Sequence, residues 1–261
     1  MARMPCASSE PTWYPYACPS ESKPCRYCPV DTTTTPAALA AASTRFLDYR
    51  DERLNRLARS LVMVNFDMPY PVSGVLDRHY HGTGLVIDAE RGLVVVDRNT
   101  VPVAMGDVRI TLAGSLELPG RVVWIHPLHN LAVVAYDPEL VGDTPVESAT
   151  FSDARVRSGD ELLAVGLKGD HRLVAQSSEV ASIDAVQFPL SRTLRFRDTN
   201  LETISLVNAP SDFDGVLVDE EGRVLSLWSS FAYHAGQDLK QVNKGVPADI
   251  VVDLLDHVRD D

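Results

Sequence analysis

Short β-rich segments separated by turn-forming residues fill most of this 261-residue chain, and they set the strongest limit on its fold. In the first half they are Leu61–Phe66, Thr83–Asp88, Leu93–Asp97, Val108–Leu112, Arg121–His126 and Leu131–Tyr136. In the second half they are Glu161–Leu167, Leu173–Ala181, Ala185–Phe188, Thr203–Val207, Gly215–Asp219 and Arg223–Trp228. Gly, Pro, Asp and Asn between them are typical of tight connections. Because closure removes exposed sheet edges, we predict an all-β protein of two six-stranded antiparallel barrels.

Two segments with helical spacing flank the strands. Thr35 and Pro36 suit the start of a helix, and Leu47, Leu54 and Leu57 follow on one stripe, which predicts a helix over residues 36–60. Apolar residues return to helical spacing in Pro247–Val258. We therefore divide the chain into a Cys- and Pro-rich leader or linker at 1–35, a helix at 36–60, barrels at 61–140 and 141–246, and a C-terminal helix at 247–261.

Charge and hydropathy limit the partners. The chain has 24 Lys and Arg against 36 Asp and Glu; residues 1–60 hold 8 and 6 of these, so residues 61–261 carry 16 and 30. A domain this acidic repels phosphate backbones, and we expect no nucleic-acid partner. The charge can also serve solubility alone. No apolar run approaches the ~18 residues that a membrane-spanning helix needs, and we expect no membrane partner.

All four cysteines lie in the leader. Cys25 and Cys28 have the spacing that presents two thiolates to one ion, and Cys6 and Cys18 would complete a tetrahedral structural zinc site. The alternative is an unpaired or disulfide-forming leader, in which aromatic residues mark a partner-binding segment. We expect no other cofactor. The first residues lack the hydrophobic stretch of a secretory signal, which favours a cytoplasmic location.

Six segments together resemble the HtrA/DegP branch of the trypsin-like serine proteases, in the order and spacing of that family. They are Gly82–Ile87, Gly92–Val96, Asn130–Val134, Ser158–Gly166, Asp214–Val224 and Asn243–Ala248. The resemblance covers roughly residues 60–258. It implies two barrels with the reactive cleft between them. In this family the last segment leads into a helix before a PDZ domain, and relatives commonly form trimers.

The resemblance also places the catalytic groups, and none of the three positions carries the expected residue. Asn99 stands where the family has its histidine, Asn130 where it has its aspartate, and Phe213 where it has its nucleophilic serine. An amide cannot accept a proton near neutral pH, so Asn99 cannot act as the general base. The sequence predicts a degenerate triad.

The loop that would form the oxyanion hole is changed as well. It corresponds to Ser211, Asp212, Asp214 and Gly215, with Ser211 and Asp214 in place of two glycines of the family motif. Those replacements put in doubt the turn that aims backbone N–H groups at an oxyanion. Phe213 either fills the groove or provides an apolar anchor, and Asp212 and Asp214 either favour a basic peptide or only solvate the loop.

Three hypotheses follow for the function. The first is a proteolytically inactive HtrA-like module that binds a peptide or protein or acts in assembly, as a homo-oligomer or beside a linked active protease or PDZ module, like the eroded half of some tandem HtrA-like proteins. The second is a serine endopeptidase with a rearranged triad of Ser211 and one of four other histidines, His79, His81, His126 or His129. The third is an adaptor whose Cys-rich leader is the functional element.

Overall fold

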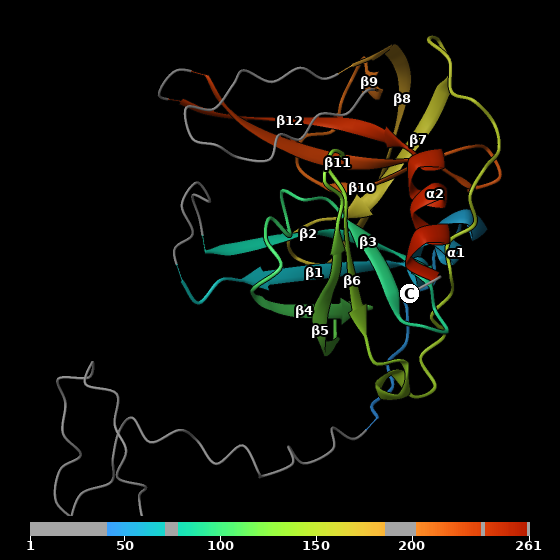
Figure 1. Cartoon of the computed structure of the whole chain (residues 1–261). Coiled ribbons are helices and arrows are strands. Elements are labelled where there is room, and N and C mark those ends of the chain that lie inside the picture. Colours follow the sequence, from blue (N-terminus) through green and yellow to red (C-terminus); the bar gives the residue numbers. More distant parts are fainter. Residues whose placement is uncertain (1–40, 71–77, 186–201, 236–237, 260–261) are drawn as a thin grey trace, which may run out of the picture. The chain divides into compact units, whose positions relative to one another are not determined.

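The computed structural model describes residues 41–70, 78–185, 202–235 and 238–259, and the strands in these ranges form two closed antiparallel barrels (Figure 1). The first barrel contains β1 (Leu61–Asp67), β2 (His79–Asp88), β3 (Leu93–Val96), β4 (Asp107–Leu112), β5 (Leu116–Ile125) and β6 (Ala132–Tyr136). The second contains β7 (Glu161–Leu167), β8 (Leu173–Asp184), β9 (Thr203–Leu206), β10 (Asp214–Val218), β11 (Val224–Ala235) and β12 (Asp238–Pro247). Each barrel closes between its first and fourth strands, since β1 pairs with β4 and β7 with β10. The predicted all-β, double-barrel fold is confirmed.

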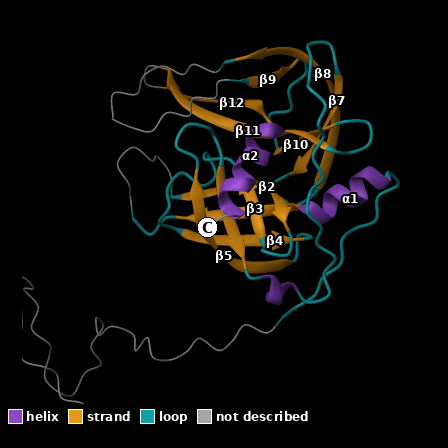
Figure 2. Ribbon diagram, turned by 45° about the vertical axis from the view of Figure 1, so that its right-hand side comes forward, coloured by secondary structure: helices purple, strands orange, loops and turns teal. Residues whose placement is uncertain are grey.

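The strands β3 and β6 of the first barrel are buried on both faces, which explains their unbroken apolar runs. Alternate residues of a strand point to opposite faces. In β3, Val94 and Val96 belong to the cluster inside the first barrel. Leu93 and Val95 belong instead to a cluster shared with strands of the second barrel. An apolar layer therefore forms part of the interface between the barrels, with the two groups of strands stacked on either side of it (Figure 2).

The predicted helix over residues 36–60 is wrong in its extent. The helix α1 spans Glu52–Ser60, and Asp51 caps it by accepting a hydrogen bond from the Arg53 N–H. Residues 41–51 are not helical, because their backbone bonds elsewhere: the N–H of Ala42 donates to the carbonyl of Leu140. Residues 36–40 lie outside the described part of the chain.

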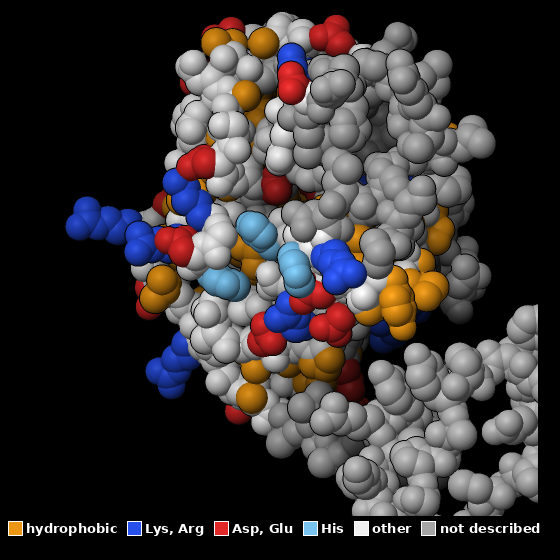
Figure 3. All heavy atoms as spheres, turned by 90° about the vertical axis from the view of Figure 1, so that its left-hand side faces the viewer, with side chains coloured by type: hydrophobic (Ala, Val, Ile, Leu, Met, Phe, Trp, Pro, Cys, Tyr) orange, Lys and Arg blue, Asp and Glu red, His pale blue; other side chains and the backbone are white. Residues whose placement is uncertain are grey.

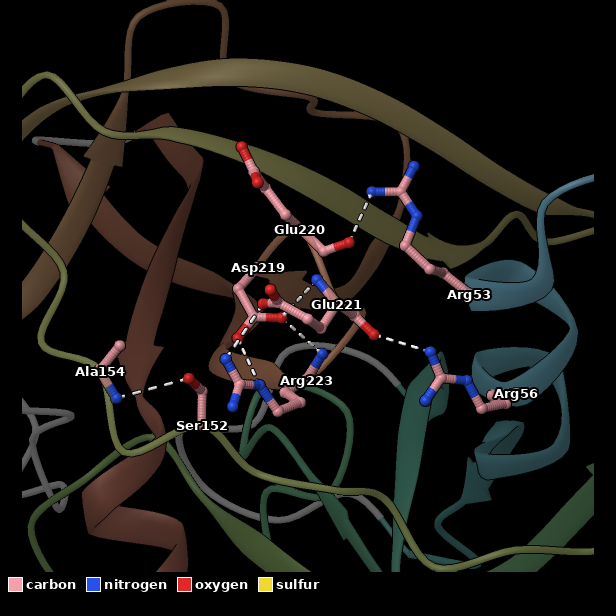
Figure 4. Close-up of polar contacts among 8 residues, drawn as sticks. All are labelled: Arg53, Arg56, Ser152, Ala154, Asp219, Glu220, Glu221 and Arg223. Atoms are coloured by element: carbon pink, nitrogen blue, oxygen red, sulfur yellow. Dashed lines mark hydrogen bonds and ion pairs between the residues drawn. The ribbon is translucent and has the colours of Figure 1, made fainter.

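Helix α1 belongs to the first barrel in sequence but holds a hairpin of the second (Figure 4). Arg53 and Arg56 donate to the backbone carbonyls of Glu220 and Glu221, at 3.2 and 2.7 Å. These carbonyls lie in the turn between β10 and β11, which Asp219 stabilises by accepting from backbone N–H groups. The helix thereby fixes one barrel against the other.

Two strand predictions in the second barrel need correction. Ala185 follows β8 outside any strand, so the predicted strand Ala185–Phe188 is wrong at this residue, and its other positions lie outside the described residues. The sixth strand is instead β12, which pairs with β11 along its whole length. Its sequence is mostly polar, and the apolar pattern therefore did not reveal it.

The chain continues from β12 directly into α2 (Ala248–Arg259), which packs on β11 and β12 through Val251, Leu254 and Leu255. A further short element, the 3-10 helix η1 (Pro138–Val141), begins the connection between the barrels. Neither α1 nor α2, within the residues that the structure describes, is long and apolar enough to cross a bilayer.

Candidate functional site

Residues of both barrels line a pocket of about 330 Å³ at their junction, and two of the three expected catalytic positions lie there. Asn99 reaches it from the loop after β3, and Phe213 from the segment before β10. Ser211 and Ser230 line the same pocket. The third position, Asn130, is fully buried just before β6. The interface predicted to hold a reactive cleft therefore does contain a pocket.

A hydrogen-bonded group of Asp97, Asn99, Asn130 and Ser230, which we call the Ser230 clamp, joins the barrels beside this pocket. Ser230, on β11, uses all its polar groups toward the first barrel. Its N–H and hydroxyl donate to one oxygen of Asp97, at 2.9 and 3.2 Å. Its hydroxyl accepts from Asn99 Nδ2 at 2.8 Å, and its carbonyl accepts from Asn130 Nδ2 at 2.7 Å.

The buried amide of Asn130 is both donor and acceptor in this group. Its Oδ1 accepts from the backbone N–H of Arg98 at 2.9 Å, while its Nδ2 donates to Ser230. An ionised carboxylate at this position has only acceptors, so it could not donate a hydrogen bond to the Ser230 carbonyl. An amide therefore fits this environment better than the aspartate that the resemblance implies.

Phe213 packs inside the second barrel, and its ring is too buried to serve as an exposed anchor. Its side chain is 7% exposed and belongs to the apolar cluster of that barrel with Leu162 and Trp228. The approach to Gly166 is so close that a Cβ there would lie 2.7 Å from Phe213 Cδ2. Of the two roles considered for this ring, the geometry supports space filling.

An ion pair connects the loop before Phe213 to the end of β7. Asp212 is exposed and pairs with Lys168 at 2.6 Å, and the hydrogen bond from Lys168 lowers the pKa of Asp212. Asp214 and Gly215 already belong to β10, opposite Leu167 and Gly166 of β7. The residues expected to shape an oxyanion hole thus continue directly into a strand ladder.

Ser211 has no imidazole partner among the described residues. His79 and His81 line the same pocket as Ser211, yet neither hydrogen-bonds to it. His79 Nδ1 is instead 2.6 Å from an oxygen of Asp67, whose other oxygen accepts from Arg109. One face of the molecule, shown in Figure 3, carries histidines beside acidic and basic side chains.

The other two histidines lie outside the pocket, in the connection between β5 and β6. His126 and His129 rings contact edge to face at 4.6 Å, and His126 also contacts Trp124. His126 Nδ1 accepts from the backbone N–H groups of Leu128 and His129. Burial, followed by the charges of His129 and Arg98, lowers the pKa of His126 to about 4. This imidazole is a neutral turn cap.

Two buried carboxyl groups give the junction its electrostatic character. Burial raises the pKa of Asp97, against the opposing effect of hydrogen bonds from Thr100 and Ser230. Burial also raises the pKa of Asp214 well above its usual value, and the negative charge of Asp97 raises it further. Asp214 accepts a hydrogen bond from Asn243 Nδ2 at 2.9 Å.

Sequence reasoning missed Asp97 and Ser230 as parts of this site. A charged residue directly after four buried strand residues was the available signal for Asp97. Ser230 lies 133 residues from Asp97 and carries no such signal.

The described residues contain no group of three or more His, Cys, Asp or Glu side chains suited to holding a metal ion. The predicted zinc ligands Cys6, Cys18, Cys25 and Cys28 lie outside the described residues, so that prediction stays untested.

No protein-family model matches the chain, but curated proteins do. The PDZ domain-containing protein C23G3.12c of Schizosaccharomyces pombe is 39% identical over 169 residues, which are 64% of this chain and 17% of that protein. The pro-apoptotic serine protease NMA111 of Eremothecium gossypii is 36% identical over 197 residues, 74% of this chain and 20% of that protein. The chain thus spans a fifth or less of these relatives.

Solved structures share the fold at low sequence identity. The active form of the Rv3671c protease of M. tuberculosis has a TM-score of 0.58 at 17% identity, covering 84% of this chain and 90% of its own. Deg5 has a TM-score of 0.55 at 16% identity, covering 79% and 93%. The HtrA-type protease AlgW, solved with a tripeptide, has a TM-score of 0.55 at 16% identity, covering 79% and 62%.

Proposed function

This chain is an HtrA-like domain with the trypsin-like fold, and we propose that it is a proteolytically inactive module, a pseudoprotease, that binds peptides or proteins or acts in assembly. The observation that carries this proposal is the state of the three triad positions. Asn99 and Asn130 are engaged in the Ser230 clamp, and Phe213 is packed inside the second barrel. A trypsin-like mechanism needs a hydroxyl, an imidazole and a carboxylate at these places.

The binding role rests on the pocket that remains at the junction. It has polar groups from both barrels and a volume near the lower end of the range for ligand sites, which begins at about 300 Å³. A related fold has been solved with a tripeptide, and one relative contains a PDZ domain. We propose that the module works as a homo-oligomer or beside an active protease half or a PDZ module.

A rearranged serine endopeptidase is the second candidate, because one observation favours it. The Asp67 carboxylate orients His79 through a 2.6 Å contact, and His79 lines the pocket that also contains Ser211. The hydrogen bond from His79 is the main cause that lowers the pKa of Asp67. The arrangement lacks the bond from the imidazole to the serine hydroxyl that would activate it.

Fluorophosphonate labelling separates these two candidates. We expect no labelling of the purified protein and no hydrolysis of casein, while an active trypsin-like protease treated in parallel is labelled. The control variant is Ser158→Ala, which removes a hydroxyl far from Ser211 in sequence. Labelling that persists in Ser158→Ala and disappears in Ser211→Ala would show that the second candidate is right.

The third candidate, an adaptor acting through its leader, is tested by deleting residues 1–35. Metal content, oligomer mass and partner capture of the full chain and the deletion are compared. If the leader is the functional element, at least one of the three changes. If none changes, the leader hypothesis is wrong.

A further inference from the structure

The carboxyl group of Asp214 lines the junction pocket, and within the described ranges it has no ion-pair partner. It is mostly buried, and among the described residues its one hydrogen bond comes from Asn243 Nδ2, at 2.9 Å, to a single oxygen. No described residue forms an ion pair with it, and its second oxygen accepts no hydrogen bond from them. Buried carboxylates in proteins are normally paired with a positive group or hydrogen-bonded through both oxygens.

Three basic side chains near this pocket, in the part of the chain that the structure describes, bind other partners. Lys168 pairs with Asp212 at 2.6 Å, and Lys244 Nζ donates to the Ser205 hydroxyl at 2.6 Å. His79 is bound to Asp67. His81 also lines the pocket.

The second carboxyl of the junction adds to the negative potential. Asp97 receives three hydrogen bonds, from the N–H of Thr100 and from the N–H and hydroxyl of Ser230, so its oxygens are already satisfied. Its charge acts on Asp214 and raises the pKa of that group beyond the effect of burial. The junction therefore contains two acids, and Asp214 is the one with an oxygen that no described residue donates to.

The rest of the lining suits a long side chain with a charged end. Met63 and Leu167 contribute apolar surface, along which the methylene groups of lysine or arginine can pack. The pocket volume of about 330 Å³ accommodates one such side chain and excludes a large ligand. The acidic domain as a whole attracts basic partners.

We propose that this pocket binds the cationic side chain of a lysine or arginine residue in a partner peptide, with the Asp214 carboxylate as its counterion. This inference rests on the proposed binding function and names the chemistry of the ligand. Asp214 must be ionised to pair with the cation. If it is protonated in the empty pocket, binding of the cation therefore releases a proton. The affinity therefore rises with pH until Asp214 is fully ionised. His79 and His81 line the same pocket, and the Asp214→Asn variant separates the contribution of Asp214 to the pH dependence from theirs.

The first test uses two small probes of similar shape and different charge. The full chain is titrated with n-butylguanidinium and with neutral n-butylurea at pH 8, and amide shifts of the pocket residues are followed by NMR. We expect the cation to bind at least about tenfold more tightly, since charge-assisted hydrogen bonds are the stronger kind. Equal affinities, or no shifts with the cation, would overturn the inference.

The variants Asp214→Asn and Asp212→Asn form a matched pair for this titration. Both remove one carboxylate from the same loop, but Asp212 is exposed and already paired with Lys168. The preference for the cation should disappear in Asp214→Asn and persist in Asp212→Asn. A preference that survives in Asp214→Asn would also overturn the inference.

An array of octapeptides in matched arginine and citrulline pairs separates this inference from the proposed function. Tighter binding of the arginine members supports both. Equal binding of the two members of each pair is consistent with the proposed binding function and refutes the cation site. Absence of binding across the array contradicts the binding function itself.

Discussion

Replacing the buried Asn130 amide with a carboxyl group tests the Ser230 clamp directly. Asn130 is 0% exposed, donates to the Ser230 carbonyl at 2.7 Å and accepts from the Arg98 N–H at 2.9 Å. In Asn130→Asp the ionised carboxylate keeps the acceptor and loses the donor. The Ser230 carbonyl then lacks this partner, which costs about 1–3 kcal/mol. Together with the uncompensated buried charge, we expect the free energy of unfolding at pH 8 to fall by about 3–5 kcal/mol.

The pH dependence of that loss has a definite sign. The introduced carboxyl is buried beside Asp97, so its pKa in the folded state lies above the unfolded value of about 3.9. The folded state then holds the proton more tightly than the unfolded state. Stability relative to the wild type is kept below pH ~4, where the protonated group can donate to Ser230, and falls by up to ~1.4 kcal/mol per pH unit as the pH rises.

Urea denaturation followed by tryptophan fluorescence measures this loss, because Trp124 and Trp228 report on separate barrels. Asn99→Asp serves as the comparison, since Asn99 is half-buried at the pocket and makes one clamp bond, so its loss should be about 1–2 kcal/mol. An Asn130→Asp protein within about 0.5 kcal/mol of the wild type at both pH 4 and pH 8 would refute the reasoning, since surface substitutions typically stay within that margin.

Three further predictions concern the two barrels and their junction. Phe213→Ala should lower the free energy of unfolding by about 3–5 kcal/mol in urea denaturation, because it empties a filled site, whereas Leu47→Ala, at a residue 74% exposed, should change it by less than about 0.5 kcal/mol. Arg56→Ala should cost about 0.5–1 kcal/mol in the same assay through loss of the bond to the Glu221 carbonyl, against no measurable change for the exposed Arg50→Ala. Asp214→Asn should stabilise the protein at pH 8 and lose this advantage toward pH 4, because a carboxyl with a raised folded pKa contributes stability only while it is protonated. Thermal unfolding of both proteins over this pH range measures the effect. Melting temperatures of variant and wild type that do not converge toward pH 4 would contradict the prediction.

Part of the fold could be predicted from the sequence because strands such as β3 and β6 are buried on both faces. Runs such as Leu93–Val96 and Ala132–Tyr136 have no polar position, and each maps onto a strand within a residue or two. β12 escaped detection for the opposite reason, since most of its sequence is polar and only its end is buried. There Gly245 permits close packing, because a Cβ would lie 2.6 Å from the Ser226 hydroxyl.

Local propensity also misjudged the start of α1. The alanine-rich stretch before Glu52 favours a helix in isolation. In the folded chain the Thr44 N–H donates to the Thr144 side chain, and the Ala42 N–H to the Leu140 carbonyl. Contacts about 100 residues away decide the conformation of this segment, and no local pattern reports them.

The contacts of the candidate site also depend on residues that are distant in the sequence. Only the family resemblance identified Asn99, Asn130 and Phe213, and it showed only that the catalytic side chains are missing there. Their positive roles depend on Ser230 and on Gly166, whose proximity only the fold reveals. Sequence also left open whether Phe213 fills a space or offers an anchor, and its 7% exposure favours the first.

Two of the three residues at the expected catalytic positions, Asn99 and Asn130, also join the barrels. In a working triad a carboxylate holds the imidazole in its orientation, and the imidazole accepts the proton of a hydroxyl. Here the Asn99 amide is bound to the Ser230 hydroxyl, and the Asn130 amide supplies a donor that a carboxylate lacks. Replacing Asn99 by a histidine or Asn130 by an aspartate would remove a clamp bond, so both amides stabilise the junction between the barrels.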